Sequence, residues 1–210
     1  MIKKNLKFLI ITSIVTILPI VAGALLWNKL PAELPIHWNM EGEVDDYASK
    51  AFVVIGMPLI LLGIHWLTAF AISADPKKSN HSDKMIHLSF SIVPALSVIL
   101  SAVTYAVGIG IEILINSVIP MILGFTSVMI GNYLPKCKQN YTMGIKIPWT
   151  LNSEENWNRT HRFAGWVWVG GGIIMIPLAP LCGVLALIPI MLIMSIAPIV
   201  YSFILHKKGI

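Results

Sequence analysis

Six apolar stretches separated by polar segments divide this chain of 210 residues. The stretches lie at about residues 8–27, 52–74, 86–109, 113–134, 163–179 and 181–205. Most are about 20 residues long, and a helix of that length crosses a hydrocarbon core of roughly 30 Å. The pattern therefore predicts an all-α polytopic membrane protein with six transmembrane helices. A composition that is 56% hydrophobic and only 12% charged agrees with this prediction.

Glycines and prolines mark the breaks between neighbouring spans. Gly108, Gly110 and Glu112 separate the third span from the fourth, and "PLAPLCG" at 177–183 predicts a tight turn between the fifth and sixth. Every span contains or borders a proline, and we expect kinks rather than breaks because neighbouring helices can satisfy the freed carbonyls. The "GGG" at 170–172 predicts close approach of the fifth span to another helix.

The distribution of basic residues predicts the orientation of the chain. With the N-terminus inside the cell, 13 of the 15 lysines and arginines are cytoplasmic, and only Lys29 and Lys50 lie outside. The cytoplasmic set is Lys3, Lys4, Lys7, Lys77, Lys78, Lys84, Lys136, Lys138, Lys146, Arg159, Arg162, Lys207 and Lys208. Because basic residues favour the cytoplasmic side, we expect both termini there. The net charge of +5 then serves topology, and we expect no direct contact with nucleic acid.

The first span has a second interpretation, as a cleaved signal peptide. Lys3 and Lys4 precede its apolar core, and "AGA" at 22–24 resembles a cleavage site. The apolar run continues through Trp27, which favours a retained transmembrane helix.

Few residues within the spans offer chemistry. His65 is the one ionisable side chain near the middle of a span, and an intramembrane histidine is a candidate site by default. A neutral histidine hydrogen-bonded to a neighbouring helix explains it equally well. Cys137 and Cys182 have no metal-ligand spacing and are predicted on opposite sides of the bilayer, so we expect no disulfide between them. We expect no metal and no cofactor.

The largest segment predicted outside is "LPAELPIHWNMEGEVDDYASK", residues 30–50. Strand alternation in "IHWNM" places His37 and Asn39 on one face and Trp38 on the other. The following "NMEG" predicts a turn in which Gly42 supplies a positive φ, and "EVDDY" predicts a returning strand. The sequence therefore predicts a β-hairpin.

This hairpin would bring Glu43 and Asp45 near the histidine and asparagine, and two interpretations stay open. The four side chains could coordinate a metal, or the hairpin could be an acidic segment lying on the membrane, with Tyr47 at the interface. Ser49 is a candidate N-cap for the second span. The candidate site residues of this outer loop are His37, Trp38, Asn39, Gly42, Glu43, Asp45 and Lys50.

A second polar segment, "IPWTLNSEENWNRTHR", occupies residues 147–162 on the predicted inner side. Asn152 followed by Glu155 is a capping-box pattern with the asparagine as N-cap. Glu155 and Arg159 form an i,i+4 pair in the favourable order. An amphipathic helix is therefore expected to start near Ser153 and to continue into the fifth span.

An irregular loop of about 17 residues precedes this helix, and loops of that length tend to be functional or disordered. Its aromatic, glycine and proline residues argue against disorder. We expect a compact cytoplasmic cap that presents a binding surface; the alternative is a juxtamembrane helix with Trp157 at the interface and Arg162 near lipid phosphates. The candidate surface residues are Asn132, Pro135, Gly144, Lys146, Pro148, Trp149, Thr150, Glu155, Trp157, Thr160, His161 and Arg162.

Both loops carry a resemblance to a known family. "LPIHWNMEGEVDDYASK" resembles the N-terminal module of the SdpI family of membrane immunity proteins. "GNYLPKCKQNYTMGIKIPWTLNSEENWNRTHR" is similar to that family's second signature, with GN-x-L-P, N-x-x-x-G-I-R, P-W-T-L and W-x-x-T-H-R. Lys146 stands where the pattern has arginine, which keeps the charge but weakens bidentate recognition. The resemblance implies a two-helix module at 1–75 with the outer loop and a four-helix region at 76–210 with the inner loop.

This resemblance implies immunity against a secreted toxic peptide of the sporulation-delaying kind. In the best-known members it also implies signalling, in which external toxin causes a cytoplasmic transcriptional repressor to be held at the membrane. The expected partners are therefore the toxin, such a repressor and the lipid bilayer.

Two other function classes compete with this one. A membrane-embedded enzyme would use His37, Glu43 and Asp45, or His161 with a carboxylate, but no nucleophile–base pair or metal motif has a recognisable spacing. A small transporter would need more polar groups within the membrane than the spans contain.

Overall fold

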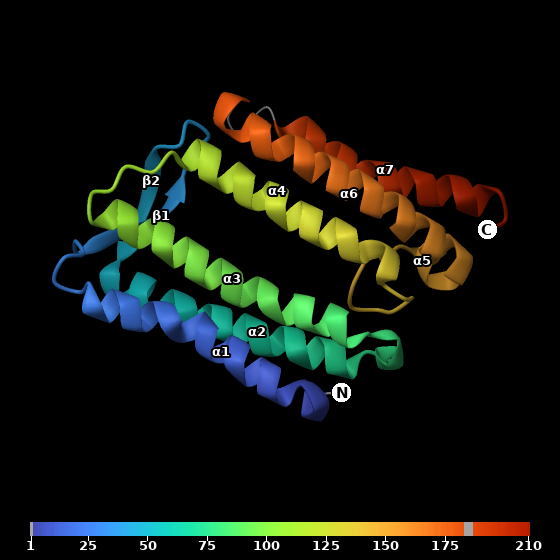
Figure 1. The fold of residues 1–210 in the computed structure, drawn as a ribbon, viewed down its shortest axis with the longest axis horizontal. Coiled ribbons are helices and arrows are strands. Elements are labelled where there is room, and N and C mark those ends of the chain that lie inside the picture. The colour runs from blue at the N-terminus through green and yellow to red at the C-terminus, as the bar shows by residue number, and fades with distance from the viewer. Residues whose placement is uncertain (1, 183–186) are drawn as a thin grey trace. The chain divides into compact units, whose positions relative to one another are not determined.

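The computed structural model describes residues 2–182 and 187–210, and six of the helices in this part of the chain are long and apolar enough to cross a membrane. This confirms the predicted all-α membrane architecture. The long helices are α1 (Ile2–Leu25), α2 (Met57–Ala74), α3 (Asp83–Gly108), α4 (Ile115–Tyr133), α6 (Glu154–Cys182) and α7 (Ile188–Lys207) (Figure 1). A π-helical turn at Phe52–Gly56 leads into α2, and a short α5 (Pro148–Asn152) precedes α6.

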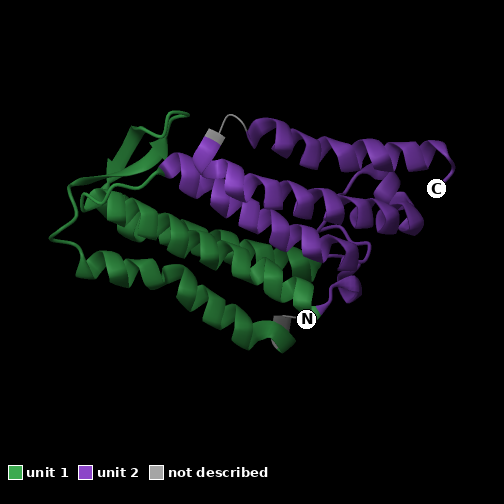
Figure 2. Ribbon diagram, turned by 45° about the horizontal axis from the view of Figure 1, so that its top comes forward, with its two compact units in different colours: residues 1–74, 83–114 green, residues 75–82, 115–210 purple. Residues whose placement is uncertain are grey.

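The chain folds into two compact units (Figure 2). Unit 1 contains residues 1–74 and 83–114, and unit 2 contains residues 75–82 and 115–210. The division into a module at 1–75 and a region at 76–210 stays a prediction; in the structure α3 packs against both α1 and α2. The polar segment 75–82 instead makes its hydrogen bonds with the loop that follows α4, and so belongs to unit 2.

Unit 1 is a three-helix bundle with a β-hairpin at one end. Strands β1 (Glu33–Trp38) and β2 (Val44–Ser49) pair antiparallel, with register irregularities on either side of His37. Leu34 on β1 is fully buried in an apolar cluster with Val54 of the π-helical turn and Tyr105 of α3. The predicted hairpin is therefore confirmed, and its first strand is anchored to the helix ends.

The intramembrane histidine lies inside unit 1. His65 on α2 is fully buried, and its Nε2 lies 3.0 Å from the hydroxyl of Thr12 on α1. This arrangement agrees with the interpretation of His65 as a residue that bonds one helix to its neighbour. A second bond of this kind runs from the hydroxyl of Ser97 on α3 to the carbonyl of Thr16, at 2.7 Å.

In unit 2, α6 packs between α4 and α7. The contact with α4 is close at two glycine pairs: a Cβ added to Gly172 would lie 2.5 Å from the carbonyl oxygen of Gly124, and one added to Gly131 would lie 3.0 Å from that of Gly165. Such small residues allow helix backbones to approach each other in membranes. The close approach predicted for the segment 170–172 is confirmed.

The predicted turn at "PLAPLCG" is wrong in position. Helix α6 continues through Pro177 and Pro180 and reaches Cys182, and α7 begins at Ile188 rather than near 181. Proline does not end this helix because a membrane helix can satisfy the freed carbonyls through its surroundings. The end of the predicted turn, at residue 183, lies outside the described residues.

Candidate functional site

The side chain of Asn39 holds the tip of the hairpin together. Its Oδ1 accepts hydrogen bonds from the backbone N–H groups of Glu41 at 3.1 Å and Glu43 at 2.9 Å. The backbone N–H of Asn39 also donates to the carbonyl of Glu43 at 2.9 Å, and Gly42 adopts the predicted positive φ of 86°. Asparagine suits this place because its short side chain can imitate a backbone turn.

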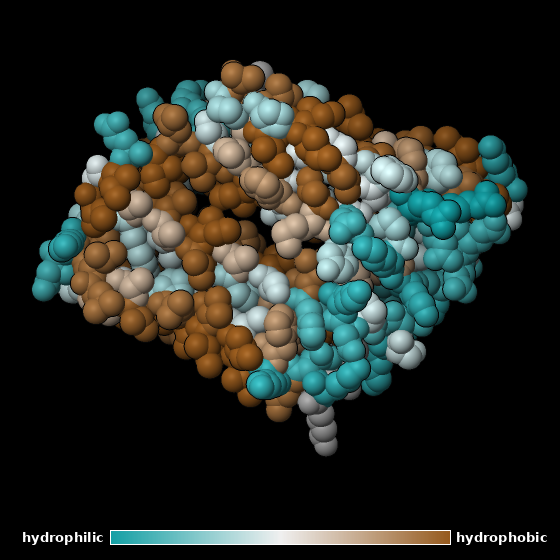
Figure 3. Space-filling model, in the orientation of Figure 1, coloured by the Kyte–Doolittle hydropathy of each residue, from teal (hydrophilic) through white to brown (hydrophobic). Residues whose placement is uncertain are grey.

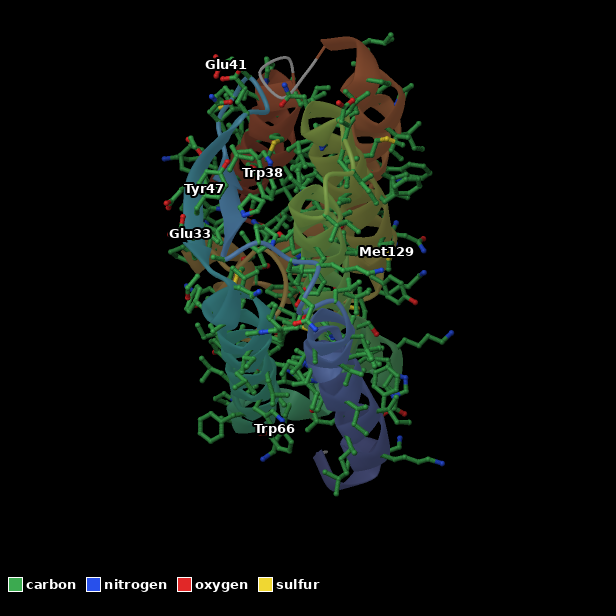
Figure 4. All side chains as sticks on the ribbon, turned by 90° about the vertical axis from the view of Figure 1, so that its left-hand side faces the viewer. Glu33, Trp38, Glu41, Tyr47, Trp66 and Met129 are labelled. Atoms are coloured by element: carbon green, nitrogen blue, oxygen red, sulfur yellow. The ribbon has the colours of Figure 1, made fainter. Side chains whose placement is uncertain are left out.

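His37 and Asp45 form an exposed pair across the hairpin. The Nδ1 of His37 lies 2.6 Å from Oδ1 of Asp45, and both side chains remain open to solvent. Exposed pairs of this kind contribute little to stability. The fold therefore depends little on this pair, and its side chains remain available for contact with a partner. In Figure 4, Glu41 lies at the tip of the hairpin and Glu33 near its base, and both residues add to its acidic character.

The metal interpretation of the hairpin gains no support. Among the residues that the structure describes, no group of three or more His, Cys, Asp or Glu side chains is arranged to hold an ion. Trp38 is half-buried at the end of β1, whereas Tyr47 on β2 is exposed.

Lys50 joins the base of the hairpin to the end of α1. Its Nζ donates to the carbonyls of Trp27 at 3.0 Å and Leu30 at 3.1 Å, and it lies 4.9 Å from the centre of the Trp27 ring. A lysine placed there satisfies carbonyls that the helix end leaves without partners. The predicted N-cap is confirmed, since Ser49 Oγ accepts the backbone N–H of Phe52 at 3.4 Å.

The second candidate site is the polar cap, which we define as residues 75–82 and 134–162 of unit 2. Figure 3 shows hydrophilic residues gathered at the end of this unit that carries α5, and hydrophobic residues along its helices. The cap contains many buried polar side chains, and their hydrogen bonds determine its shape.

The buried carboxylate of Asp75 is one centre of the polar cap. Its Oδ1 accepts the backbone N–H of Lys77 at 2.7 Å. Its Oδ2 accepts the backbone N–H of Tyr141 at 2.9 Å and the hydroxyl of Thr142 at 2.5 Å, and lies 3.2 Å from Nε2 of His81. Asp75 therefore ties the segment after α2 to the loop after α4.

These contacts keep Asp75 charged. Burial raises the pKa of the Asp75 carboxyl, but hydrogen bonds from Thr142, Lys77, Tyr141 and His81 outweigh it and leave the pKa below its ordinary value of 3.8. The side chains of Asp75 and His81 are almost fully buried, at 0% and 1% exposure. A charge so deeply buried requires such partners.

Gln139 connects three segments of the polar cap. Its Oε1 accepts the ammonium group of Lys77, and its backbone carbonyl accepts the amide of Asn80 at 2.7 Å. Its own amide donates to the carbonyls of Thr150 at 2.8 Å and Leu151 at 2.9 Å. The irregular loop is therefore ordered by side-chain contacts rather than by regular secondary structure.

Trp157 and His161 support the loop from the face of α6. The Trp157 Nε1–H donates to the carbonyl of Cys137 at 2.6 Å, and the two rings stack with centroids 4.0 Å apart. The Nδ1 of His161 lies 2.8 Å from the carbonyl of Trp157, while Nε2 accepts the backbone N–H of Ile145 at 2.9 Å. Because a carbonyl can only accept, the proton is on Nδ1 and the imidazole is neutral.

Gly144 leaves room for this histidine. It has a φ of 104°, and a Cβ at that position would meet the imidazole ring of His161. A glycine here therefore serves both the turn and the close approach of loop to helix.

Four of the predicted contact residues are buried, and their part in binding a partner stays a prediction. Thr150, Trp157, Thr160 and His161 have exposed fractions of 0%, 0%, 0% and 1%. Their polar atoms bind the cap's own backbone and side chains instead of facing outward. Of the other candidates, Trp149 is half-buried, and the exposed ones are Asn132, Pro135, Gly144, Lys146, Pro148, Glu155 and Arg162.

The N-cap of α6 is Ser153, which corrects the prediction of Asn152. The Oγ of Ser153 accepts the backbone N–H of Asn156 at 3.1 Å, while Asn152 is the last residue of α5. The extra helical turn of α5 moves the cap by one residue. The predicted pair of Glu155 and Arg159 is confirmed, at 2.5 Å.

Asn156, which sequence reasoning missed, joins α6 to the end of α7. Its amide donates to the carbonyls of Ser202 at 3.0 Å and Ile210 at 3.1 Å. Its Oδ1 accepts the hydroxyls of Ser202 at 2.5 Å and Thr160 at 3.1 Å. The i,i+4 spacing of Asn156 and Thr160 is the signal that could have revealed this buried face.

Cys137 is a free, buried cysteine in the loop. Burial raises the pKa of its thiol from 9.0 to about 11, although a hydrogen bond from Asn140 opposes the effect. A thiol of this kind is a poor nucleophile, because the thiolate is the reactive form. The side chain of Cys182 lies outside the described part of the chain, so the expected absence of a disulfide with it stays a prediction.

Comparisons with known proteins match both sites. Residues 136–202 match the model of the SdpI/YfhL protein family, and residues 14–62 match a domain of unknown function, DUF1648. The first match contains much of the polar cap, all of α6 and most of α7, and the second contains the hairpin. Over 209 residues the chain is 28% identical to the immunity protein SdpI of Bacillus subtilis (strain 168), covering 98% of this chain and 97% of that protein. No solved structure matches the chain.

Proposed function

We propose that this chain is a membrane immunity protein, with a role like that of the SdpI protein it resembles over its whole length. The full-length similarity carries the proposal, because it includes all six membrane-length helices together with both ordered loops. The enzyme alternative is less favoured, since both ring nitrogens of His161 are engaged by backbone groups. The transporter alternative is less favoured because His65 is bonded to a neighbouring helix.

The orientation we propose has both termini in the cytoplasm, the hairpin outside and the polar cap inside. The basic residues support it: within unit 1, Lys4 pairs with Asp83 at the start of α3, while the hairpin follows the opposite end of α1. Maleimide labelling of intact cells tests it, with Glu41→Cys and Lys138→Cys introduced singly. Labelling at 41 alone is expected, and labelling at 138 from outside would contradict the orientation.

We place contact with a secreted toxic peptide at the hairpin. Its exposed acidic residues, Glu33, Glu41, Glu43, Asp45 and Asp46, outnumber its lysines. Lys50 is occupied by the carbonyls at the end of α1, so it offsets little of this charge toward a ligand. An acidic surface attracts a cationic peptide and accelerates its encounter.

Expression of the chain in a toxin-sensitive strain tests this function, with survival and membrane abundance measured together. His37→Ala and Asp45→Ala are expected to reduce protection at unchanged abundance, because they alter an exposed pair that contributes little to folding. Glu112→Ala is the matched control, since it removes an exposed acid that lies outside the hairpin. Full protection by both hairpin variants would remove the hairpin from the toxin-binding site.

We further propose that the exposed face of the polar cap receives a cytoplasmic repressor. Beside Trp149 lies a hollow of about 520 Å³ that Pro148, Glu155 and His206 also line. The Trp149 ring stacks on His206 at 5.8 Å, and its indole N–H has no partner among the described residues. An aromatic residue in such a hollow is typical of a binding hot spot.

Recruitment of the repressor to membranes tests this second surface. Trp149→Ala is expected to weaken recruitment about 30-fold, which corresponds to a hot-spot loss of about 2 kcal/mol. Lys138→Ala, an exposed change in the same loop but outside the hollow, is expected to leave recruitment unchanged. Unchanged recruitment by Trp149→Ala at normal abundance would refute the assignment.

A further inference from the structure

A polar hollow of about 460 Å³ opens on unit 2 between α6 and α7. We call it the polar cup, and its lining residues are Asn158, Arg159, Arg162, Phe163, Trp166 and Tyr201. Arg162 and Trp166 lie one helical turn apart on α6, so their side chains share a face. The floor is aromatic, because the rings of Phe163 and Tyr201 stack with centroids 4.5 Å apart.

The polar cup carries an uncompensated positive charge. Arg159 pairs with Glu155 at 2.5 Å. Arg162 is exposed and makes no ion pair or hydrogen bond with the residues that the structure describes. Trp166 is 76% exposed, which leaves its indole N–H open to a ligand. The cup therefore offers a guanidinium group and neutral donors to an anion.

An apolar groove of about 450 Å³ adjoins the polar cup. The two hollows share Phe163 and Tyr201, so the floor of the cup is also a wall of the groove. Leu192, Ile196 and Val200 line the groove at four-residue intervals along α7. This stripe of side chains extends about 12 Å along the helix axis, at 1.5 Å per residue.

We propose that the polar cup and apolar groove together bind one anionic phospholipid, with its phosphate at Arg162 and an acyl chain along α7. The cup lies where α6 passes from the polar cap into its apolar part, and tryptophan and tyrosine are enriched at that depth of a membrane protein. Arginine suits the headgroup because its planar fork matches phosphate geometry. An apolar peptide or a second copy of this chain would fill the groove without using the unpaired charge.

Native mass spectrometry of the purified, detergent-solubilised chain tests the site with phosphatidylglycerol, phosphatidylcholine or inorganic phosphate added. Phosphatidylglycerol is expected to be retained about tenfold more than phosphatidylcholine, a difference of about 1.4 kcal/mol. Arg162→Gln should abolish this preference, and Arg162→Lys should keep part of it because the charge remains. Lys208→Gln, the matched control, removes one charge at the end of α7 outside both hollows and should keep the full preference.

The same experiment tests the apolar groove with a separate variant. Ala197 is a small residue in its lining, and Ala197→Phe should fill the groove and reduce retention of both lipids. Equal retention of phosphatidylglycerol by the chain, Arg162→Gln and Ala197→Phe would overturn the proposal. Displacement of the lipid by millimolar inorganic phosphate would overturn it in favour of a simple phosphate site. Loss of dimers rather than of lipid in Ala197→Phe would overturn it in favour of a contact between copies. These measurements do not depend on immunity, so their failure leaves the proposed function intact.

Discussion

Replacement of Asp75 by alanine should open the loop of the polar cap without unfolding the helices. The carboxylate accepts two backbone N–H groups, those of Lys77 and Tyr141, and the hydroxyl of Thr142. Alanine provides no acceptor, so the two backbone N–H groups lose their partner, whereas the Thr142 hydroxyl still has Asn140 Oδ1 at 3.4 Å. The segment 75–82 would then be tied to the loop after α4 by fewer bonds, chiefly those of Lys77 and Asn80 to Gln139.

The size of this effect follows from the count of donors. Each donor left without a partner costs about 1–3 kcal/mol, so the two backbone N–H groups cost at least about 2 kcal/mol. At about 1.4 kcal/mol for each tenfold change, the open population of the loop should rise at least about 30-fold.

Trypsin cleavage after Lys138 measures this opening, because Lys138 is an exposed residue of the loop. When opening and closing are faster than cleavage, the cleavage rate follows the open population. Asp83→Ala is the matched control: its carboxylate forms an exposed pair with Lys4, and such pairs contribute little. A cleavage rate in Asp75→Ala within about twofold of the unsubstituted chain would refute the reasoning, since the expected ratio is at least about 30.

The pKa of Asp75 adds a dependence on pH with a definite sign. Its folded-state pKa lies below the ordinary value of 3.8, so its stabilisation is fully present above that value and disappears as pH falls through the folded pKa. Asp75→Asn cannot titrate. The melting temperatures of the unsubstituted chain and of Asp75→Asn should therefore differ by a constant amount from pH 7 to pH 5, because the carboxyl begins to titrate only about one unit above 3.8. In stronger acid the two melting temperatures should converge. Intrinsic tryptophan fluorescence follows both transitions.

Two further predictions concern packing and reactivity. Gly172→Ala should lower stability by about 1–3 kcal/mol because the new methyl group meets the backbone of α4. Gly170→Ala should leave stability unchanged, because a Cβ at that position meets nothing within 4 Å. Equal melting temperatures for these two variants would contradict the close helix approach. Cys137 has a thiol pKa of about 11 instead of 9.0, so at pH 8 it should hold about 100-fold less thiolate than an ordinary cysteine. Mass spectrometry should find iodoacetamide alkylation slow in the folded chain and faster in Asp75→Ala, and rapid alkylation of the folded chain would contradict its burial.

The hairpin could be predicted from the sequence because its determinants are local. Asn39 and Gly42 form the turn within four residues, and His37 meets Asp45 only eight residues later. Turn chemistry and strand alternation are both visible over such distances. The irregular register around His37 could not be foreseen, because it depends on how β1 fits against the helix ends.

The interior of the polar cap could not be predicted, because its bonds join residues far apart in the sequence. Asp75 lies 66 residues from Tyr141, and no local pattern pairs a residue beside "PKK" with that backbone N–H. The sequence predicts Trp157 and His161 at the surface, because polar atoms on a juxtamembrane helix usually face water. Here the irregular loop presents backbone groups to these side chains, so their polar atoms form hydrogen bonds inside the polar cap.

The two glycine contacts between α4 and α6 limit the motions by which unit 2 could transmit a signal. Gly124 and Gly131 are seven residues apart, as are Gly165 and Gly172, so the contacts repeat after about two helical turns, or 10.5 Å. A slide of one turn would drive backbone against side chains at both places at once. These helices should therefore move as a single rigid body, and α7, which Asn156 and Trp168 bond to α6, should move with them unless those bonds break.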